Sequence, residues 1–166
     1  MNRRTFMQKT GFIMSGLTLS PLIGKSYSSI YGQTAPSNKV KVALIGCRSM
    51  GYGDLNTFLD YPETECVALC DVDDEWLNKR AADVEKKTGK KVPHLYKDWR
   101  RVIDNKDVDV VIIGTPDHWH CLPTVWACQA GKDVYVEKPL SNTIEECNLM
   151  EKAARKYNRI VQVGQW

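Results

Sequence analysis

The stretch VKVALIGCRSMG (residues 40–51), followed by CVALCD (residues 66–71), decides how the chain is expected to fold. An apolar run stops at Gly46, a helix-like segment follows, and a second apolar run stops at Asp71. Strand, glycine turn, helix, strand and acid is the order that a dinucleotide-binding unit requires. We expect the first N–H groups of the helix to face a pyrophosphate, and Asp71 to accept hydrogen bonds from an adenosine ribose.

Arg48 occupies the position of the usual second glycine, which is a departure from the motif. The usual glycine lets the backbone approach the pyrophosphate closely. A strand-to-helix turn with two glycines also occurs in proteins that bind nothing, so this stretch alone leaves cofactor binding open.

The rest of the chain continues as short apolar runs that alternate with helical patterns. The expected strands are 92–96, 108–113, 133–136 and 160–163, and the expected helices are 73–89, 98–103, 121–130 and 143–157. This alternation predicts an α/β fold, a doubly wound parallel sheet of the Rossmann type, in one domain over residues 36–166.

Helix signals support this division of the chain. Asp98 is expected to cap one helix, and Thr143 with Glu146 has the spacing of a capping box at another. The last predicted helix carries an apolar stripe at helical spacing. Its members are Ile144, Cys147, Met150, Ala154 and Tyr157.

Composition is that of an ordinary globular protein, and the net charge of +3 is too small to indicate a nucleic-acid partner. Four lysines, at positions 86, 87, 90 and 91, close a predicted helix and its turn. We favour a solvated helix end with cations at the negative end of the dipole over a basic binding patch.

None of the six cysteines forms a Cys-x-x-Cys pair, so the patterns of zinc and thioredoxin sites are absent. Cys66 and Cys70 are about 13 Å apart along a predicted strand, and Cys121 and Cys128 about 10 Å apart along a predicted helix. Both separations exceed disulfide reach. We expect most of these thiols to be small buried apolar groups, and bridges between elements stay open.

The first 35 residues are expected to be a signal and linker. Arg3 and Arg4, then Phe6 and a weakly apolar run over 11–24, look like a twin-arginine export signal. The run is too short and too rich in Gly, Ser and Thr for a comfortable membrane span. The sequence therefore predicts a periplasmic protein, and a chance basic start on a cytoplasmic or signal-anchored chain is the alternative.

Polar clusters follow three predicted strands: the Gly46 loop with Asp71, then 115–120, then 137–139. Ligands of open parallel sheets bind beyond the carboxyl ends of the strands, so we expect one rim to gather all three. Asp117, His118, His120 and Cys121 also admit a metal site, but the two histidine side chains, two residues apart at a turn, need not converge. We predict no metal.

These residues resemble a known family. ALIGCRSMG, ALCDVD, TPDHWH and VEKPLS look like the glucose-fructose oxidoreductase / inositol dehydrogenase / rhizopine-catabolism family of NAD(P)-dependent oxidoreductases, over about residues 39–166. The resemblance implies NAD as cofactor, with NADP as the alternative. It also implies that Lys138 stands between nicotinamide and substrate and assists proton transfer from the reacting hydroxyl.

The resemblance implies further contacts with the cofactor. The adenosine half would be held by the loop and the strand-end acid, and the nicotinamide side would be lined by the two later clusters. The residues are Gly46, Cys47, Arg48, Ser49, Met50, Gly51 and Asp71 for the first, and Thr115, Pro116, His120, Glu137 and Lys138 for the second.

Family members continue into an α+β domain that binds substrate, and this sequence does not contain it. We therefore expect the cofactor domain of an oxidoreductase acting on a sugar or cyclic polyol, inactive alone, with the second half or another copy as partner. A glycosidase that uses NAD transiently is a second hypothesis; such relatives tend to lack the lysine at position 138. A cofactor-binding module without catalysis is a third.

Overall fold

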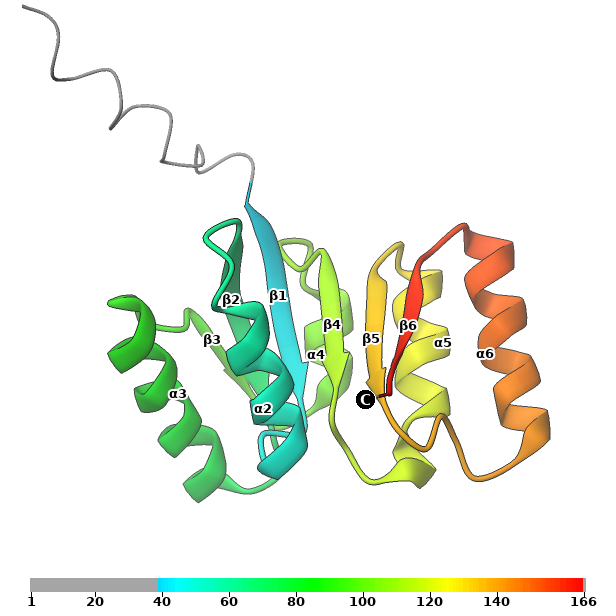
Figure 1. Ribbon diagram of the computed structural model, residues 1–166, viewed down its shortest axis with the longest axis horizontal. Helices are drawn as coiled ribbons and strands as arrows, with labels where there is room; N and C mark the ends of the chain where they lie inside the picture. The colour runs from blue at the N-terminus through cyan, green and yellow to red at the C-terminus, as the bar shows by residue number, and fades with distance from the viewer. Residues whose placement is uncertain (1–38, 166) are drawn as a thin grey trace, which may run out of the picture. The chain divides into compact units, whose positions relative to one another are not determined.

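The computed structural model describes residues 39–165, and six parallel strands form its centre (Figure 1). The strands lie in the order β3-β2-β1-β4-β5-β6. Their bounds are β1 Val40–Ile45, β2 Thr64–Cys70, β3 His94–Tyr96, β4 Val110–Ile113, β5 Asp133–Glu137 and β6 Val161–Gly164. The predicted doubly wound parallel sheet is confirmed, and the strand order reverses between β1 and β4, where such sheets bind their ligands.

Helices cover both faces of the sheet (Figure 1). Helices α2 and α3 pack on one face, and α4, α5 and α6 pack on the other. Their bounds are α2 Ser49–Phe58, α3 Asp74–Thr88, α4 Trp99–Asp104, α5 Cys121–Gln129 and α6 Ile144–Tyr157, with a short 3-10 turn, η2, at Asp117–Trp119. Two apolar cores result, one on each face, as expected for buried parallel strands.

The predicted caps begin the helices where the sequence indicated. The Asp98 carboxylate accepts from Arg100 N at the start of α4, and the Thr143 hydroxyl accepts from Glu146 N at the start of α6. At the other end of α3, Gly89 takes the left-handed conformation with φ +71°.

Some element boundaries differ from the sequence expectation. The expected strand 108–113 pairs only from Val110, because Val108 still belongs to the turn that follows α4. Helix α5 begins at Cys121, as expected for a helix that carries both Cys121 and Cys128, and the short turn η2 leads directly into it. Ile144, placed on the apolar stripe of α6, is 76% exposed, since it stands in the first turn, whereas Met150 is 1% exposed.

The buried cysteines behave as small apolar groups. Four of the six thiols are buried, and all six are free. The residues are Cys47, Cys66, Cys70 and Cys128. Burial raises the pKa of the Cys66 thiol to about 12, which keeps it protonated and unreactive at neutral pH.

Two of the four lysines at and after the end of α3 form ion pairs on the surface. Lys87 contacts Asp60 at 2.6 Å and Lys90 contacts Glu65 at 2.8 Å.

No helix in the described part of the chain is long and apolar enough to cross a membrane. The signal and linker expected before residue 36 lie outside the described residues.

Candidate functional site

Three glycines bring backbone against backbone where β1, β4 and α2 meet. Gly46 ends β1 with φ +90°, and a Cβ added there would lie 2.7 Å from the carbonyl carbon of Gly114. A Cβ on Gly51 would lie 2.3 Å from Gly46 O, and one on Gly114 would lie 2.3 Å from the Cα of Gly51. The turn between β1 and α2 is therefore as tight as a cofactor-binding turn needs to be. Gly114 was not among the site residues expected from sequence, although it follows β4 directly, as Gly46 follows β1.

The N-terminus of α2 opens from this turn. Arg48 is its N-cap in extended conformation, with φ −85°, so a side chain is tolerated at the position of the usual second glycine. No side chain caps the helix, and no acid stands in its first turn. The first N–H groups of the helix, with the positive end of its dipole, therefore remain for an anion.

Asp71 follows β2 and joins its end to the glycine loop. Its Oδ2 accepts from Cys47 N at 2.7 Å, and its Oδ1 accepts from Asp73 N at 3.0 Å. The Cys47 side chain points away, into the core, where its thiol lies 3.5 Å from Cys70 O. Cys47 therefore contributes its backbone to the loop, and the Asp71 carboxylate is held in place before any ligand arrives.

Arg80 of α3 supports the loop from behind, and the sequence argument did not include it. Its Nε donates to Cys47 O at 3.2 Å, and its guanidinium lies 4.1 Å from the centre of the Tyr52 ring. Asp83 accepts from the same guanidinium at 2.8 Å. Only the three-dimensional structure brings α3 against this loop, so no local pattern in the sequence could have indicated the contact.

A cleft of about 710 Å³ lies beyond the carboxyl ends of β1, β2 and β4. Of the predicted site residues, five line it: Gly46, Arg48, Asp71, Thr115 and Pro116. The structure adds side chains that the sequence argument did not place in the site: Asp73, Lys97, Asp98, Trp99, Arg100, His118 and Trp119. The predicted convergence of the first two polar clusters on one rim is thus present in the structure.

His120 connects two of the loops instead of lining the cleft. It is 1% exposed, and its ring nitrogens lie 2.8 Å from Thr115 O and 2.8 Å from Pro139 O. The imidazole therefore holds the loop after β4 against the loop after β5. The Thr115 hydroxyl is buried and has no hydrogen-bond partner among the described residues, so a ligand group in the cleft could satisfy it.

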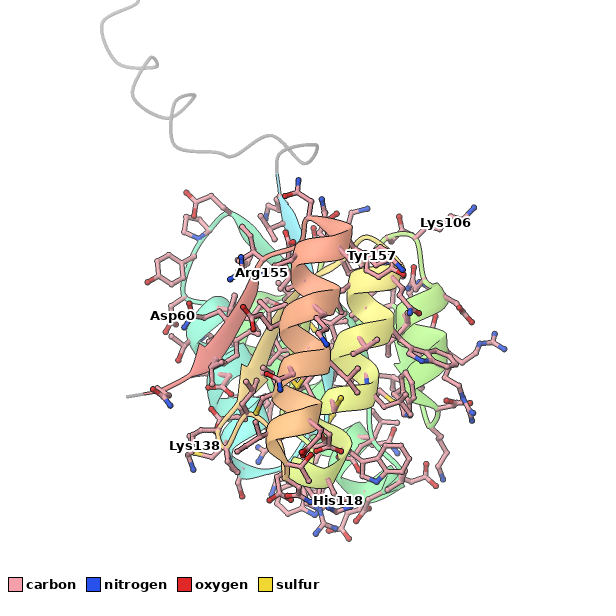
Figure 2. The ribbon with its side chains drawn as sticks, turned by 90° about the vertical axis from the view of Figure 1, so that its right-hand side faces the viewer. Asp60, Lys106, His118, Lys138, Arg155 and Tyr157 are labelled. Carbon is pink, nitrogen blue, oxygen red and sulfur yellow. The ribbon has the colours of Figure 1, made fainter. Side chains whose placement is uncertain are left out.

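Lys138 stands at the same end of the molecule. Figure 2 shows Lys138 and His118 at one end, and Lys106 and Tyr157 at the other. Lys138 is exposed and follows β5 directly, and the peptide bond to Pro139 is cis. Within residues 39–165 no carboxylate lies within ion-pair distance of its ammonium, so the group remains free to act on a ligand.

Glu137, the residue before this lysine, is paired with a second buried acid. Glu137 is 4% exposed and Asp54 of α2 is 5% exposed. Burial, together with the charge of Glu137 and a hydrogen bond to it, raises the pKa of Asp54 to about 7. Asp54 Oδ2 and Glu137 Oε1 have no hydrogen-bond partner within the described residues, and the raised pKa of Asp54 would let a proton on its carboxyl group be shared with Glu137.

Sheet, glycine turn, open helix N-terminus and strand-end carboxylate define a Rossmann-type dinucleotide-binding domain. Residues 40–165 match the family model described as "Oxidoreductase family, NAD-binding Rossmann fold". The chain therefore belongs to the Gfo/Idh/MocA oxidoreductase family and is an NAD-binding domain of it.

Individual relatives agree with this assignment. An NAD binding oxidoreductase from Klebsiella pneumoniae is 31% identical with a TM-score of 0.66, over 77% of this chain and 35% of that one. A myo-inositol 2-dehydrogenase from Lactobacillus plantarum is 26% identical with a TM-score of 0.66, over 76% and 36%. "Glycosyl hydrolase family 109 protein 1" from Shewanella sp. (strain ANA-3) is 29% identical over 93% of this chain and 37% of its own length. The chain thus spans about a third of the length of these relatives.

Proposed function

We propose that this NAD-binding domain serves the oxidation or reduction of a hydroxyl-bearing carbon in a sugar or cyclic polyol. The observation that carries the proposal is the glycine turn with its open helix N-terminus and the Asp71 carboxylate, all facing one cleft. The substrate class follows from the inositol dehydrogenase among the similar structures.

The chain's residues divide the work of holding the cofactor. The N–H groups at the start of α2 would take the pyrophosphate, and Asp71 would take the ribose hydroxyls. Bound NAD supplies the acceptor or donor of a hydride. Lys138, free of ion-pair partners in the described part of the chain, takes the proton from the reacting hydroxyl or returns it. Thr115 and Pro116 would line the nicotinamide side, while His120 would hold the two loops behind it.

The proposal is tested in two stages. Calorimetric titration of the 166-residue chain with NAD tests cofactor binding. Expression of the reading frame that contains this sequence, with any frame directly downstream, then gives the protein to assay for NADH formation with a panel of sugars and inositols. NADH formed with one of them, and lost on Lys138→Met while NAD binding remains, is the expected result. An unchanged rate in the Lys138→Met protein would remove this lysine from the chemistry.

A glycosidase that uses NAD without net consumption is the second candidate. The curated relatives named glycosyl hydrolase family 109 favour it. The two functions differ in their product: a glycosidase releases a sugar from a chromogenic glycoside with no net NADH, whereas a dehydrogenase accumulates NADH. Sugar release without NADH would replace the first proposal by the second.

We also infer that residues 1–35 form an export signal and linker ahead of the domain at 36–166. The support is the Arg3–Arg4 pair followed by a short apolar run. Replacing both arginines with lysine is expected to keep the protein in the cytoplasm of fractionated cells. Periplasmic protein in this variant at the level of the unchanged chain would contradict export by the twin-arginine route.

A further inference from the structure

Every cation that lines the cleft is paired with a carboxylate. Arg48 is paired with Asp73, Lys97 with Asp74 at 2.8 Å, and Arg100 with Asp98 at 2.9 Å. Asp71 has no cationic partner within residues 39–165, since its oxygens accept from backbone N–H groups. The ribose end of the cleft therefore carries one uncompensated negative charge although three basic side chains surround it.

Arg48 is the basic side chain at the glycine turn, as the N-cap of α2. It stands between Gly46 and the first turn of α2, and it is 61% exposed. A guanidinium at such a place would suit the 2′-phosphate of NADP, since arginine binds phosphate through two parallel hydrogen bonds. In this structure it points instead to the loop after β2, where it donates to Asp73 Oδ2 and lies 5.6 Å from the centre of the Trp76 ring.

Asp73 is held so that it keeps its position when a ligand approaches. Its Oδ1 caps α3 by accepting from Glu75 N at 3.0 Å and from Trp76 N at 3.5 Å. Its own N–H donates to Asp71 Oδ1 at 3.0 Å. The hydrogen bond from Arg48 lowers the pKa of the Asp73 carboxyl, which is therefore ionised at neutral pH.

We propose that Asp73 is a specificity-determining residue for the cofactor, because it occupies the Arg48 guanidinium and so withholds it from a 2′-phosphate. The proposal rests on the cofactor position given above. Asp71 repels the 2′-phosphate directly. Asp73 pairs with Arg48, whose positive charge would otherwise offset that repulsion. To bind NADP, the protein would have to break an ion pair whose carboxylate is already fixed by the helix.

Asp73→Asn tests the proposal, because asparagine is as good an N-cap as aspartate but carries no charge. Asp107→Asn is the control: it also breaks a surface ion pair, with Lys41, but neither residue lines the cleft. NAD and NADP are titrated separately into the full chain and both variants by calorimetry. Circular dichroism and the melting temperature confirm that each variant is folded, and Asp73→Ser, another good cap, replaces the first variant if it is not.

We expect Asp73→Asn to bind NADP about tenfold more tightly than the unchanged chain, which is the size of one charge-assisted hydrogen bond to phosphate. NAD affinity should change by less than about twofold, and Asp107→Asn should leave the preference for NAD as it was. Adding Arg48→Met to Asp73→Asn should abolish the gain, which assigns it to the arginine.

Two failures are distinguishable. If the unchanged chain binds NAD but Asp73→Asn leaves the NADP-to-NAD ratio unaltered, or raises it equally with Arg48→Met present, Asp73 does not set specificity through Arg48. If the unchanged chain binds neither cofactor, the proposed function fails and the inference fails with it.

Discussion

Single residues decide the electrostatics of the rim. Asp71 is positioned by two backbone N–H groups, and Asp73 holds the arginine that stands beside it. Glu137, the residue before Lys138, forms a buried acid pair with Asp54 of α2. The acid at 71 was expected from sequence because it follows an apolar strand at a fixed distance from the glycines. The partners of Arg48 and Glu137 could not be expected from sequence. Asp73, the partner of Arg48, comes from the loop before α3, and Asp54, the partner of Glu137, comes from α2, and no periodicity relates these positions.

The Asp54–Glu137 pair should make stability depend on pH. The folded-state pKa of Asp54, about 7, lies above its ordinary value of 3.8. An acid whose folded pKa is raised contributes stability that is complete below the unfolded pKa and is lost as the pH rises through the folded pKa. This contribution therefore falls between about pH 4 and pH 7, by at most about 1.4 kcal/mol per pH unit.

Asp54→Asn should remove this dependence, because the amide replaces the protonated carboxyl and still donates to Glu137. Urea unfolding at pH 4, 5, 6, 7 and 8 should show the variant gaining in stability relative to the unchanged chain from pH 4 to pH 7, with little further change at pH 8. Carboxyl groups outside this pair are the same in both proteins, so the difference isolates the Asp54–Glu137 pair. If the free energies of unfolding of the two proteins change in parallel from pH 4 to pH 8, Asp54 and Glu137 do not share a proton.

At the scale of elements, the glycine turn depends on how closely α2 approaches β1 and β4. Periodicity and caps predicted the helices and strands well, because apolar spacing, Asp98, Thr143 and Gly89 act locally. The contact of Gly51 with Gly114 could not be predicted in this way, since it joins residues more than sixty positions apart.

Two glycines of α2 should respond oppositely to alanine. The Cβ of Gly51→Ala would meet Gly46 O at 2.3 Å, so the helix must move away from the strand. We expect a loss of roughly 2 kcal/mol or more in the free energy of unfolding, in the range of overpacked cores, together with weaker NAD binding. The Cβ of Gly53→Ala meets nothing within 4 Å, and the helix should gain up to about 1 kcal/mol. Equal unfolding midpoints in urea for the two variants would contradict the close approach.

At the scale of the whole molecule, the parallel order of the strands brings the three polar clusters to one end. The sequence could predict this gathering because parallel strands share their carboxyl edge. It could not predict which residues face the cleft: His120 lies behind it and joins two loops, while Trp99 and Arg100, taken from sequence as parts of a helix, line it. The arrangement of side chains around a cleft depends on contacts between loops, and loop conformation is only weakly encoded by local pattern.

The central claim is that this rim binds NAD. It is tested most directly by titrating NAD into the ¹⁵N-labelled chain and following backbone amide shifts by NMR. The account predicts saturable shifts at Gly46, Ser49, Met50 and Gly51, with the opposite end of the sheet, around Asp109 and Lys132, unmoved. Shifts centred on Asp109 and Lys132, or no shifts at millimolar NAD, would contradict it.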